Sequence, residues 1–391
     1  MSKVAKSLKM SREGFNGKKN KQGINYWRFF FNARTQESAS EKTFFLDFEM
    51  LNPWVSPAET LLGFKPRISF TQEDLQYALA GTQSAKELKT ENMVQPSYCA
   101  VHLGILGESS TVLSKYVCVK NLTFKNKPFE FNCPDFSFSD NKLQGSLSVS
   151  EAEKREHPEY LCNVGRCFWD LNYEILNESS QGYSKDGKKW FPSGLQSKFS
   201  GKLIFNDVEY LVDPRRSFGY VDRYIGNEFP STWFHISSSN IKSIISGNQY
   251  FDSSVAIQGV FRNKLSLVSK LGELTLNMTA DSKKYSSIFD CQQAPEPDED
   301  GDSILHWSAS FTNKIWVVDV DIFCKIKDLA NRNFELPEGN RKVLNMLSSG
   351  SGYGEVKAFK KQKKNVLELV EHVNLSSVIC EYGHTEDGSN E

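Results

Sequence analysis

Apolar and polar residues alternate in short runs along most of the chain, with the period of two that is typical of β-strands. The runs INYWRFFFNAR and KTFFLDFEML, which begin at Ile24 and Lys42, are separated by a polar turn and predict a hairpin. Similar runs recur between residues 97 and 176 and again between residues 199 and 382. Short strands at regular spacing favour an antiparallel barrel or sandwich over βαβ units. The pattern therefore predicts an all-β protein.

Two segments show helical spacing instead. Residues 71–92 contain TQEDLQYALAG, which we expect to form an excursion from the sheet. Residues 336–352, LPEGNRKVLNMLSSGSG, predict one short helix that begins after Pro337 and is ended by Ser and Gly. We expect this helix to pack on, or to plug, the second β unit. The expected fold class is thus all-β with a few short helices.

The segment 177–192, NESSQGYSKDGKKWFP, is polar and rich in Gly, Ser and Lys, which is typical of a linker between two cores. A chain of 391 residues also exceeds what one core usually supports. We therefore expect two consecutive β domains, at residues 23–190 and 191–385, with a short tail at 386–391. The first 22 residues are rich in Lys and have little to bury, so they predict a disordered basic tail.

Composition and charge restrict the partners. The net charge of −1 provides no global field for nucleic acid, and the 13% aromatic content suits pleated surfaces or an apolar cavity. The eight Cys and six His residues show no zinc-ligand spacing, so we expect free thiols and no metal. There is no apolar run long enough to span a bilayer and no secretory signal, which predicts a cytoplasmic protein and leaves peripheral membrane contact open.

Common catalytic motifs are missing from the sequence. It contains no G-x-G-x-x-G, no P-loop, no G-x-S-x-G and no H-E-x-x-H. In the acidic segment 294–303, Asp298, Asp300 and Asp302 are similar to the start of an EF-hand loop, but the closing Glu is missing. We therefore expect a solvated loop there and no bound cofactor.

The most informative segment is 219–240, GYVDRYIGNEFPSTWFHISSSN. It resembles the Y-x-E-K-x-x-G-x-x-F-P-x-x-W-F signature of the tocopherol cyclase-like family, with Asp222 at the acidic position and Arg223 at the basic one. Upstream, Gly201, Tyr210 and Asp213 agree in order and approximate spacing. The other matched positions are Tyr220, Gly226, Phe229, Pro230, Trp233, Phe234 and, near the end of the chain, Tyr353, Gly354 and Glu355.

The resemblance implies two lipocalin-like β domains, a fold shared with carotenoid hydratase-like proteins, and an apolar isoprenoid, quinol or lipid as the ligand. Cyclisation or hydration of an alkene, an isomerase or lyase type of step, needs a proton donor and aromatic faces that stabilise a carbocation. Asp222 and Glu228 are the candidate acids, although the signature includes only Asp222. The aromatic residues expected to line the cavity are Tyr26, Trp27, Tyr220, Trp233, Trp307 and Trp316.

A structural interpretation competes with the catalytic one. Asp222 and Arg223 would then form a buried ion pair that fixes a barrel corner, with Glu355 as a second partner of Arg223. The matching functional alternative is a non-catalytic lipocalin-like carrier or interaction protein, in which aromatic side chains fill the interior. Ile225 and His235 replace tryptophans of the family pattern, and these departures bear on the substrate more than on the fold.

Overall fold

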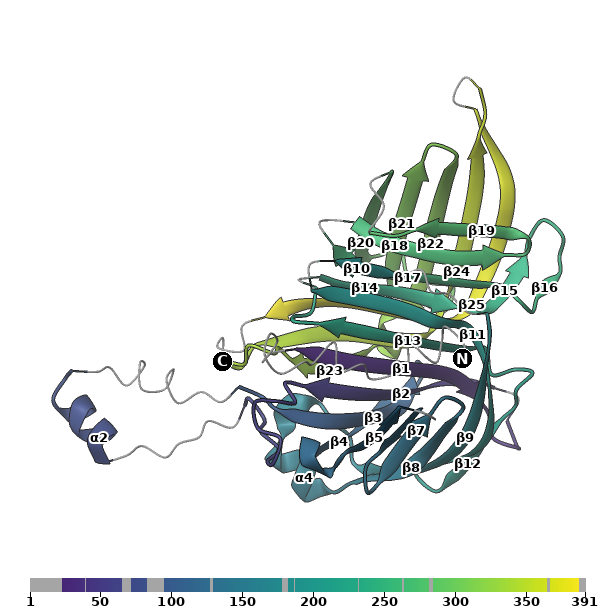
Figure 1. Cartoon of the computed structure of the whole chain (residues 1–391). Coiled ribbons are helices and arrows are strands. Elements are labelled where there is room, and N and C mark those ends of the chain that lie inside the picture. Colours follow the sequence, from purple (N-terminus) through teal and green to yellow (C-terminus); the bar gives the residue numbers. More distant parts are fainter. Residues whose placement is uncertain are drawn as a thin grey trace.

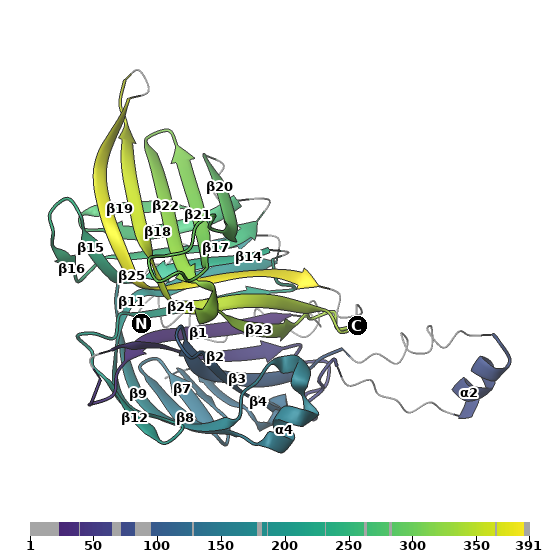
Figure 2. The same cartoon turned by 180° about the vertical axis from the view of Figure 1, so that it is seen from behind.

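The structure is a computed structural model that describes residues 23–38, 40–64, 72–82, 95–126, 129–177, 182–185, 187–230, 232–261, 264–280, 284–363 and 366–386. Within these residues the chain forms two antiparallel sheets and almost no helix (Figure 1, Figure 2). The all-β prediction is therefore confirmed. The predicted basic tail, residues 1–22, and residues 387–391 of the second tail lie outside the described residues.

The first sheet is a half-barrel of 13 strands in the order β4-β3-β2-β1-β13-β11-β9-β8-β7-β6-β5, with β10 and β12 beside β11. Its curl brings β4 close to β8. The strands are β1 (Ile24–Ala33), β2 (Lys42–Leu51), β3 (Tyr98–Leu106), β4 (Thr111–Val117), β5 (Thr123–Asn126), β6 (Phe129–Asn132), β7 (Phe136–Ser139), β8 (Lys142–Val149), β9 (Gly165–Asn177), β10 (Tyr183–Lys185), β11 (Lys188–Phe205), β12 (Val208–Val212) and β13 (Gly219–Gly226).

The second sheet has 12 strands in the order β19-β18-β17-β14-β25-β24-β22-β21-β20, with β15, β16 and β23 off this path. The strands are β14 (Thr232–Ser238), β15 (Asn240–Ser243), β16 (Gln249–Tyr250), β17 (Ser254–Phe261), β18 (Lys264–Leu271), β19 (Leu274–Met278), β20 (Tyr285–Gln293), β21 (Ile304–Asn313), β22 (Trp316–Lys325), β23 (Ala330–Glu335), β24 (Val343–Lys361) and β25 (Leu367–Glu386).

Helical structure is confined to short pieces in the described part of the chain. They are α2 (Gln72–Leu79), α4 (Glu151–Glu156) and the 3₁₀ turns η2 (Val119–Asn121), η3 (Pro158–Tyr160) and η4 (Ile326–Asp328). Helix α2 falls within the predicted excursion at residues 71–92, part of which lies outside the described residues. Of the helices described, none is long and apolar enough to cross a membrane.

The chain passes from the first sheet to the second between Gly226 and Thr232, because β11, β12 and β13 pair within the first sheet. The predicted division at residue 190 does not coincide with this change. The polar segment 177–192 connects β9 to its antiparallel neighbour β11 and contains β10, so it is a hairpin connection and the start of a strand. Gly, Ser and Lys are common in hairpin connections as well as in linkers, so the composition alone does not separate the two.

The helix predicted for residues 336–352 is wrong. Residues 343–361 form the long strand β24, which pairs with β22, β23 and β25. Leu344 and Met346 are both buried, which fits the period of two of a strand. A Cβ atom on Gly352 would lie 3.0 Å from the carbonyl oxygen of Val378, so this glycine permits close approach of β25 rather than ending a helix.

Apolar side chains form three cores, one inside each sheet and one between the sheets. Strand β1 contributes to two of them because both of its faces are buried. Trp27 and Phe29 point into the half-barrel, whereas Tyr26 and Phe30 join the core between the sheets. The one charged residue of this strand, Arg28, is therefore fully enclosed.

Candidate functional site

Asp222 lies on β13, fully buried at the boundary between the sheets. Its carboxylate accepts hydrogen bonds from Arg28 Nε at 2.7 Å, from the Tyr220 hydroxyl at 2.8 Å and from Trp190 Nε1 at 2.9 Å. A further ion pair joins it to a terminal nitrogen of Arg28. Ionised carboxylates only accept hydrogen bonds, so these donors all complement the charged form of Asp222.

Arg28 extends this network from the first sheet to the second. It donates to Glu381 Oε2 on β25 at 2.6 Å and to Gln258 Oε1 on β17 at 2.9 Å. The Trp233 indole donates to the same Glu381 oxygen at 2.9 Å, and the guanidinium lies 5.1 Å from the Trp233 ring centroid. Burial opposes the positive charge, but Asp222 and Glu381 together hold the pKa of Arg28 well above its ordinary value.

A second arginine joins the sheets nearby. Arg332 on β23 forms an ion pair with Asp47 on β2, whose Oδ2 also accepts a hydrogen bond from the Tyr26 hydroxyl at 2.7 Å. Arg332 also approaches Glu381 to 3.8 Å. We call Arg28, Arg332, Asp47, Asp222 and Glu381 the interface cluster. It links the two sheets through charges that are almost completely removed from water.

The ion pairs predicted for Arg223 are wrong. Successive side chains on a strand point to opposite faces, so Arg223 lies on the other side of β13 from Asp222. It donates to Asn25 Oδ1 at 2.7 Å and lies 4.7 Å from the Trp27 ring centroid. Glu355 instead contacts Lys357 and, at 2.7 Å, His372. The actual partner of Asp222, Arg28, is 194 positions away in sequence.

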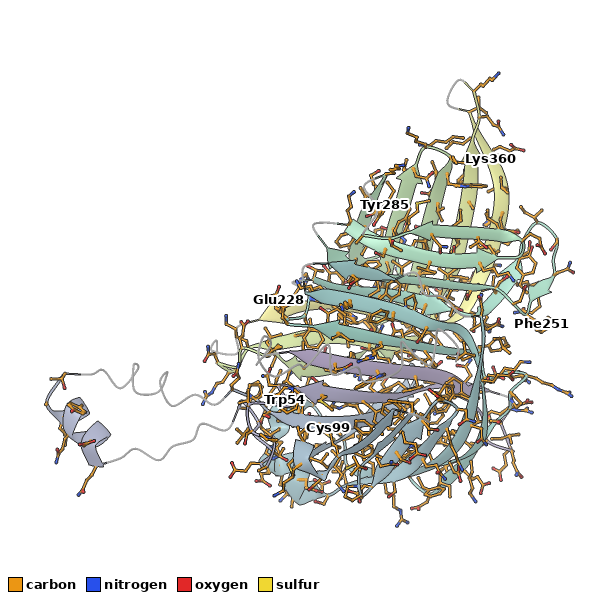
Figure 3. All side chains as sticks on the ribbon, in the orientation of Figure 1. Trp54, Cys99, Glu228, Phe251, Tyr285 and Lys360 are labelled. Carbon is orange, nitrogen blue, oxygen red and sulfur yellow. The ribbon has the colours of Figure 1, made fainter. Side chains whose placement is uncertain are left out.

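The other predicted site residues are divided between regions. Glu228 is an exposed residue at the edge of the molecule and forms an ion pair with Lys188 at 2.8 Å (Figure 3). The acid roles of Asp222 and Glu228 stay predictions. The core between the sheets contains Tyr26, Tyr220, Phe229 and Trp233. Three tryptophans lie outside this core: Trp27 in the half-barrel core, Trp307 in the second-sheet core and Trp316 at the rim of the second-sheet core. Tyr353 is 43% exposed.

A pocket of about 580 Å³ opens beside α4 and β4. Helix α4 is fixed by a capping box between Ser150 and Glu153, which satisfies its first N–H groups. The rings of Tyr116 and Tyr160 lie in the wall of this pocket, with their centroids 4.9 Å apart. We call it the tyrosine pocket. Its wall also includes Leu61, Leu62, Ser114, Lys115, Val149, Lys154, His157 and Cys162.

Two buried acids lie behind this wall. Glu335, at the end of β23, accepts a hydrogen bond from the Gly63 N–H at 2.5 Å and interacts with the Tyr160 side chain. Burial raises the pKa of Glu335 to about 8, which its contacts with Tyr160 and Gly63 oppose. Burial also raises the pKa of Glu49, on β2, to about 8. Both carboxyl groups are therefore mostly protonated at neutral pH.

Glu49 is connected to the pocket through two neighbouring strands. Its Oε2 lies 3.3 Å from His102 Nε2 on β3, and His102 Nδ1 lies 2.8 Å from the Ser114 hydroxyl on β4. Burial, with Arg332 nearby, lowers the pKa of His102 to about 3, so the ring is neutral. A protonated Glu49 that donates to Nε2 assigns the ring hydrogen to Nδ1, which then donates to Ser114. These contacts form a hydrogen-bonded path from Glu49 to the pocket wall.

Sequence reasoning missed Arg28, Glu49, His102 and Glu335. For the first three a signal was available, since each charged or ionisable residue interrupts an apolar strand: Arg28 in YWRFFF, Glu49 in FLDFEML and His102 in AVHLGIL. A polar residue in such a run is buried and needs partners.

The acidic loop holds a lysine at its centre. Ligand oxygens of Asp298, Asp300 and Asp302 lie within 4.8 Å of one another. The Lys325 ammonium contacts these three carboxylates at 2.9, 2.7 and 2.8 Å. The lysine supplies the positive charge that such a cluster requires.

Comparison with known proteins gives a structural likeness. No protein-family model matches the sequence, and no curated protein matches it. A putative AttH from Nitrosomonas europaea is similar in structure, with a TM-score of 0.45 and 9% identity over 95% of this chain and 97% of that chain. Kievitone hydratase from Nectria haematococca has a TM-score of 0.38 and 11% identity over 90% of this chain and 88% of that chain. Both scores are too low to carry an argument about function.

Proposed function

We propose that this protein binds an apolar isoprenoid, quinol or lipid in the tyrosine pocket and protonates an alkene of that ligand, leading to cyclisation or hydration as in the tocopherol cyclase-like family that the sequence resembles. The observation that carries the proposal is a pocket whose wall holds the rings of Tyr116 and Tyr160 and also Ser114, which a hydrogen-bonded path through His102 connects to the buried acid Glu49. The volume of about 580 Å³ suits a small organic ligand.

The chemistry requires a proton and a surface that tolerates a carbocation. The negative faces of tyrosine rings stabilise a cation, and Tyr116 and Tyr160 present two such rings. Glu49 can supply a proton through His102 and Ser114, whose hydroxyl lies in the pocket wall. Glu335 is a second protonated acid beside Tyr160. The alkene carbon gains a proton and the glutamate becomes a carboxylate. Loss of a proton from the cation, or from water that adds to it, returns the proton to the glutamate.

A second candidate function is a carrier without turnover. Four contacts surround the Asp222 carboxylate, and each of them satisfies one of its oxygens as an acceptor. A carboxylate that is held in this way suits a structural role, which favours the carrier. In that case the pocket would hold the same ligand class without changing it.

Ligand binding is tested by native mass spectrometry of the purified protein. We expect an apolar molecule to co-purify with the wild type and to be lost in Thr60→Trp, which fills the pocket from an exposed lining position. Thr275→Trp, on an exposed face of β19, is the matched control and should keep the ligand. The proposal would be contradicted if the wild type carried no apolar ligand, or if the Thr60→Trp variant still bound the ligand.

Turnover is tested with the recovered ligand in heavy water. Protonation of an alkene places deuterium on carbon, so the wild type should give a deuterated product. The Glu49→Gln/Glu335→Gln variant should keep the ligand and lose the deuterium. If Asp222→Asn abolishes deuteration and the glutamine variant does not, the acid is Asp222. If the ligand binds but neither the wild type nor any variant incorporates deuterium, the protein is a carrier without turnover.

A further inference from the structure

The β24–β25 hairpin projects beyond the rest of the second sheet and forms one end of the molecule (Figure 1, Figure 2). Ala358 and Val373 are the last fully buried residues on its two strands. Beyond them each strand continues for several residues, which at about 3.3 Å per residue places the tip roughly 15–20 Å outside the core. The hairpin therefore reaches away from the body of the protein.

Apolar side chains are concentrated at this tip. Val366, Leu367, Leu369 and Val370 are 58%, 47%, 43% and 39% exposed. Ile315, in the adjacent β21–β22 turn, is 53% exposed, and its carbonyl accepts a hydrogen bond from the Lys361 N–H at 2.7 Å. Leu367 and Leu369 share one face of the hairpin and Val370 lies on the other, because successive strand residues point to opposite faces. Scattered apolar residues are normal on a surface, but a group of them on both faces of a projecting end marks an interaction site.

Basic side chains accompany these apolar residues. Lys360, Lys361 and Lys363 lie on the same hairpin, and Lys314 is in the adjacent turn. One acid, Glu368, lies among them: it is the cross-strand partner of Lys360 and contacts Gln362. Lys361 pairs with Leu367 and Phe359 pairs with Leu369, so these four side chains share one face. The tip thus combines a local positive charge with apolar groups, although the whole chain has a net charge of −1.

We propose that this hairpin docks the protein on an anionic lipid surface. Apolar side chains flanked by lysines are the combination that inserts at the boundary between headgroups and acyl chains while the cations contact anionic lipids. A projecting tip reaches such a surface before the rest of the molecule does. The charge is the reason for choosing a lipid surface over a second copy of the chain, since two positive tips repel each other. The docking site is independent of the ligand pocket.

The test is flotation of the purified full chain with vesicles of phosphatidylcholine, with or without phosphatidylserine. We expect binding that requires phosphatidylserine and falls with added salt. Leu367→Asp/Leu369→Asp should abolish it. Because each lysine near an anionic surface contributes about fivefold in partitioning, Lys360→Gln/Lys361→Gln/Lys363→Gln should reduce it about a hundredfold.

Phe251→Asp is the matched control. Phe251 is 72% exposed, and it lies at the side of the second sheet rather than at the end that carries Lys360 (Figure 3). This variant should bind vesicles as the wild type does. The proposal is overturned if the wild type fails to float with either vesicle, or if Leu367→Asp/Leu369→Asp still floats. Self-association that the same double substitution removes, without vesicle binding, would assign the hairpin to a protein contact instead.

Discussion

The interface cluster and the tyrosine pocket both place carboxyl groups among aromatic rings, but their neighbours differ. In the cluster, Asp222 and Glu381 contact the guanidinium of Arg28. Behind the pocket, Glu49 contacts a neutral histidine and Glu335 contacts a backbone N–H. A cation in contact favours the ionised acid, whereas burial beside neutral groups favours the protonated one. Asp47, the third acid of the cluster, shows both effects, since burial raises its pKa while Arg332 and Tyr26 oppose the rise. Contacting groups and burial therefore act together on whether a buried carboxyl group holds a proton.

The largest effect is expected from removing Arg28, one of the two cations of the cluster. Arg28→Met would leave Asp222 and Glu381 buried without their guanidinium, and we expect a loss of about 3–5 kcal/mol in the free energy of unfolding. Urea denaturation followed by fluorescence measures the loss. Arg28→Lys, which keeps the charge but not the forked geometry, should lie between this variant and the wild type.

The control for this substitution is Arg166→Met. Arg166 pairs with Asp207 at the surface, where both side chains are 69% exposed, so its loss should change stability little. Equal stability of Arg28→Met and Arg166→Met would mean that the cluster does not hold the sheets together.

The strand pattern, the aromatic cores and the all-β class could be predicted from local sequence, because alternation along a strand reflects which face is buried. The helix predicted for residues 336–352 failed because Gly350 and Gly352 permit close packing of β24 there and do not end a helix. The partners of Asp222 could not be predicted. Arg28 reaches Asp222 only because β13 pairs with β1, and Glu381 of the second sheet is in turn a partner of Arg28.

The second prediction concerns the two protonated glutamates. In the unfolded chain a glutamate titrates near 4.5, whereas in the native state the pKa values of Glu49 and Glu335 are about 8. Between these values the native state binds the proton and the unfolded state does not, so stability falls as pH rises. Between about pH 7 and 8 we expect a loss of about 1 kcal/mol for each group.

Urea denaturation at several pH values measures this slope. His102 has a native pKa of about 3, and an unfolded histidine has lost its proton by about pH 7. His102 therefore changes the dependence of stability on pH only below the range of about pH 7 to 8. The Glu49→Gln/Glu335→Gln variant should show a flatter profile. An identical slope in that variant and the wild type would place the titrating groups elsewhere.

The smallest effect compares one substitution in both regions. Tyr220→Phe removes a hydroxyl that donates at 2.8 Å to the Asp222 carboxylate, which is ion-paired with Arg28, and a hydrogen bond to a charged group contributes about 1.5–3 kcal/mol. Tyr160→Phe removes a hydroxyl beside the mostly protonated Glu335, where a neutral contact contributes about 1 kcal/mol or less. We therefore expect Tyr220→Phe to be less stable than Tyr160→Phe by about 1 kcal/mol at pH 7 in urea denaturation. Above about pH 8 the difference should shrink, because Glu335 then becomes ionised and Tyr160 acquires a charged neighbour of its own. A difference that stays constant with pH would show that Glu335 does not change its charge in the native state.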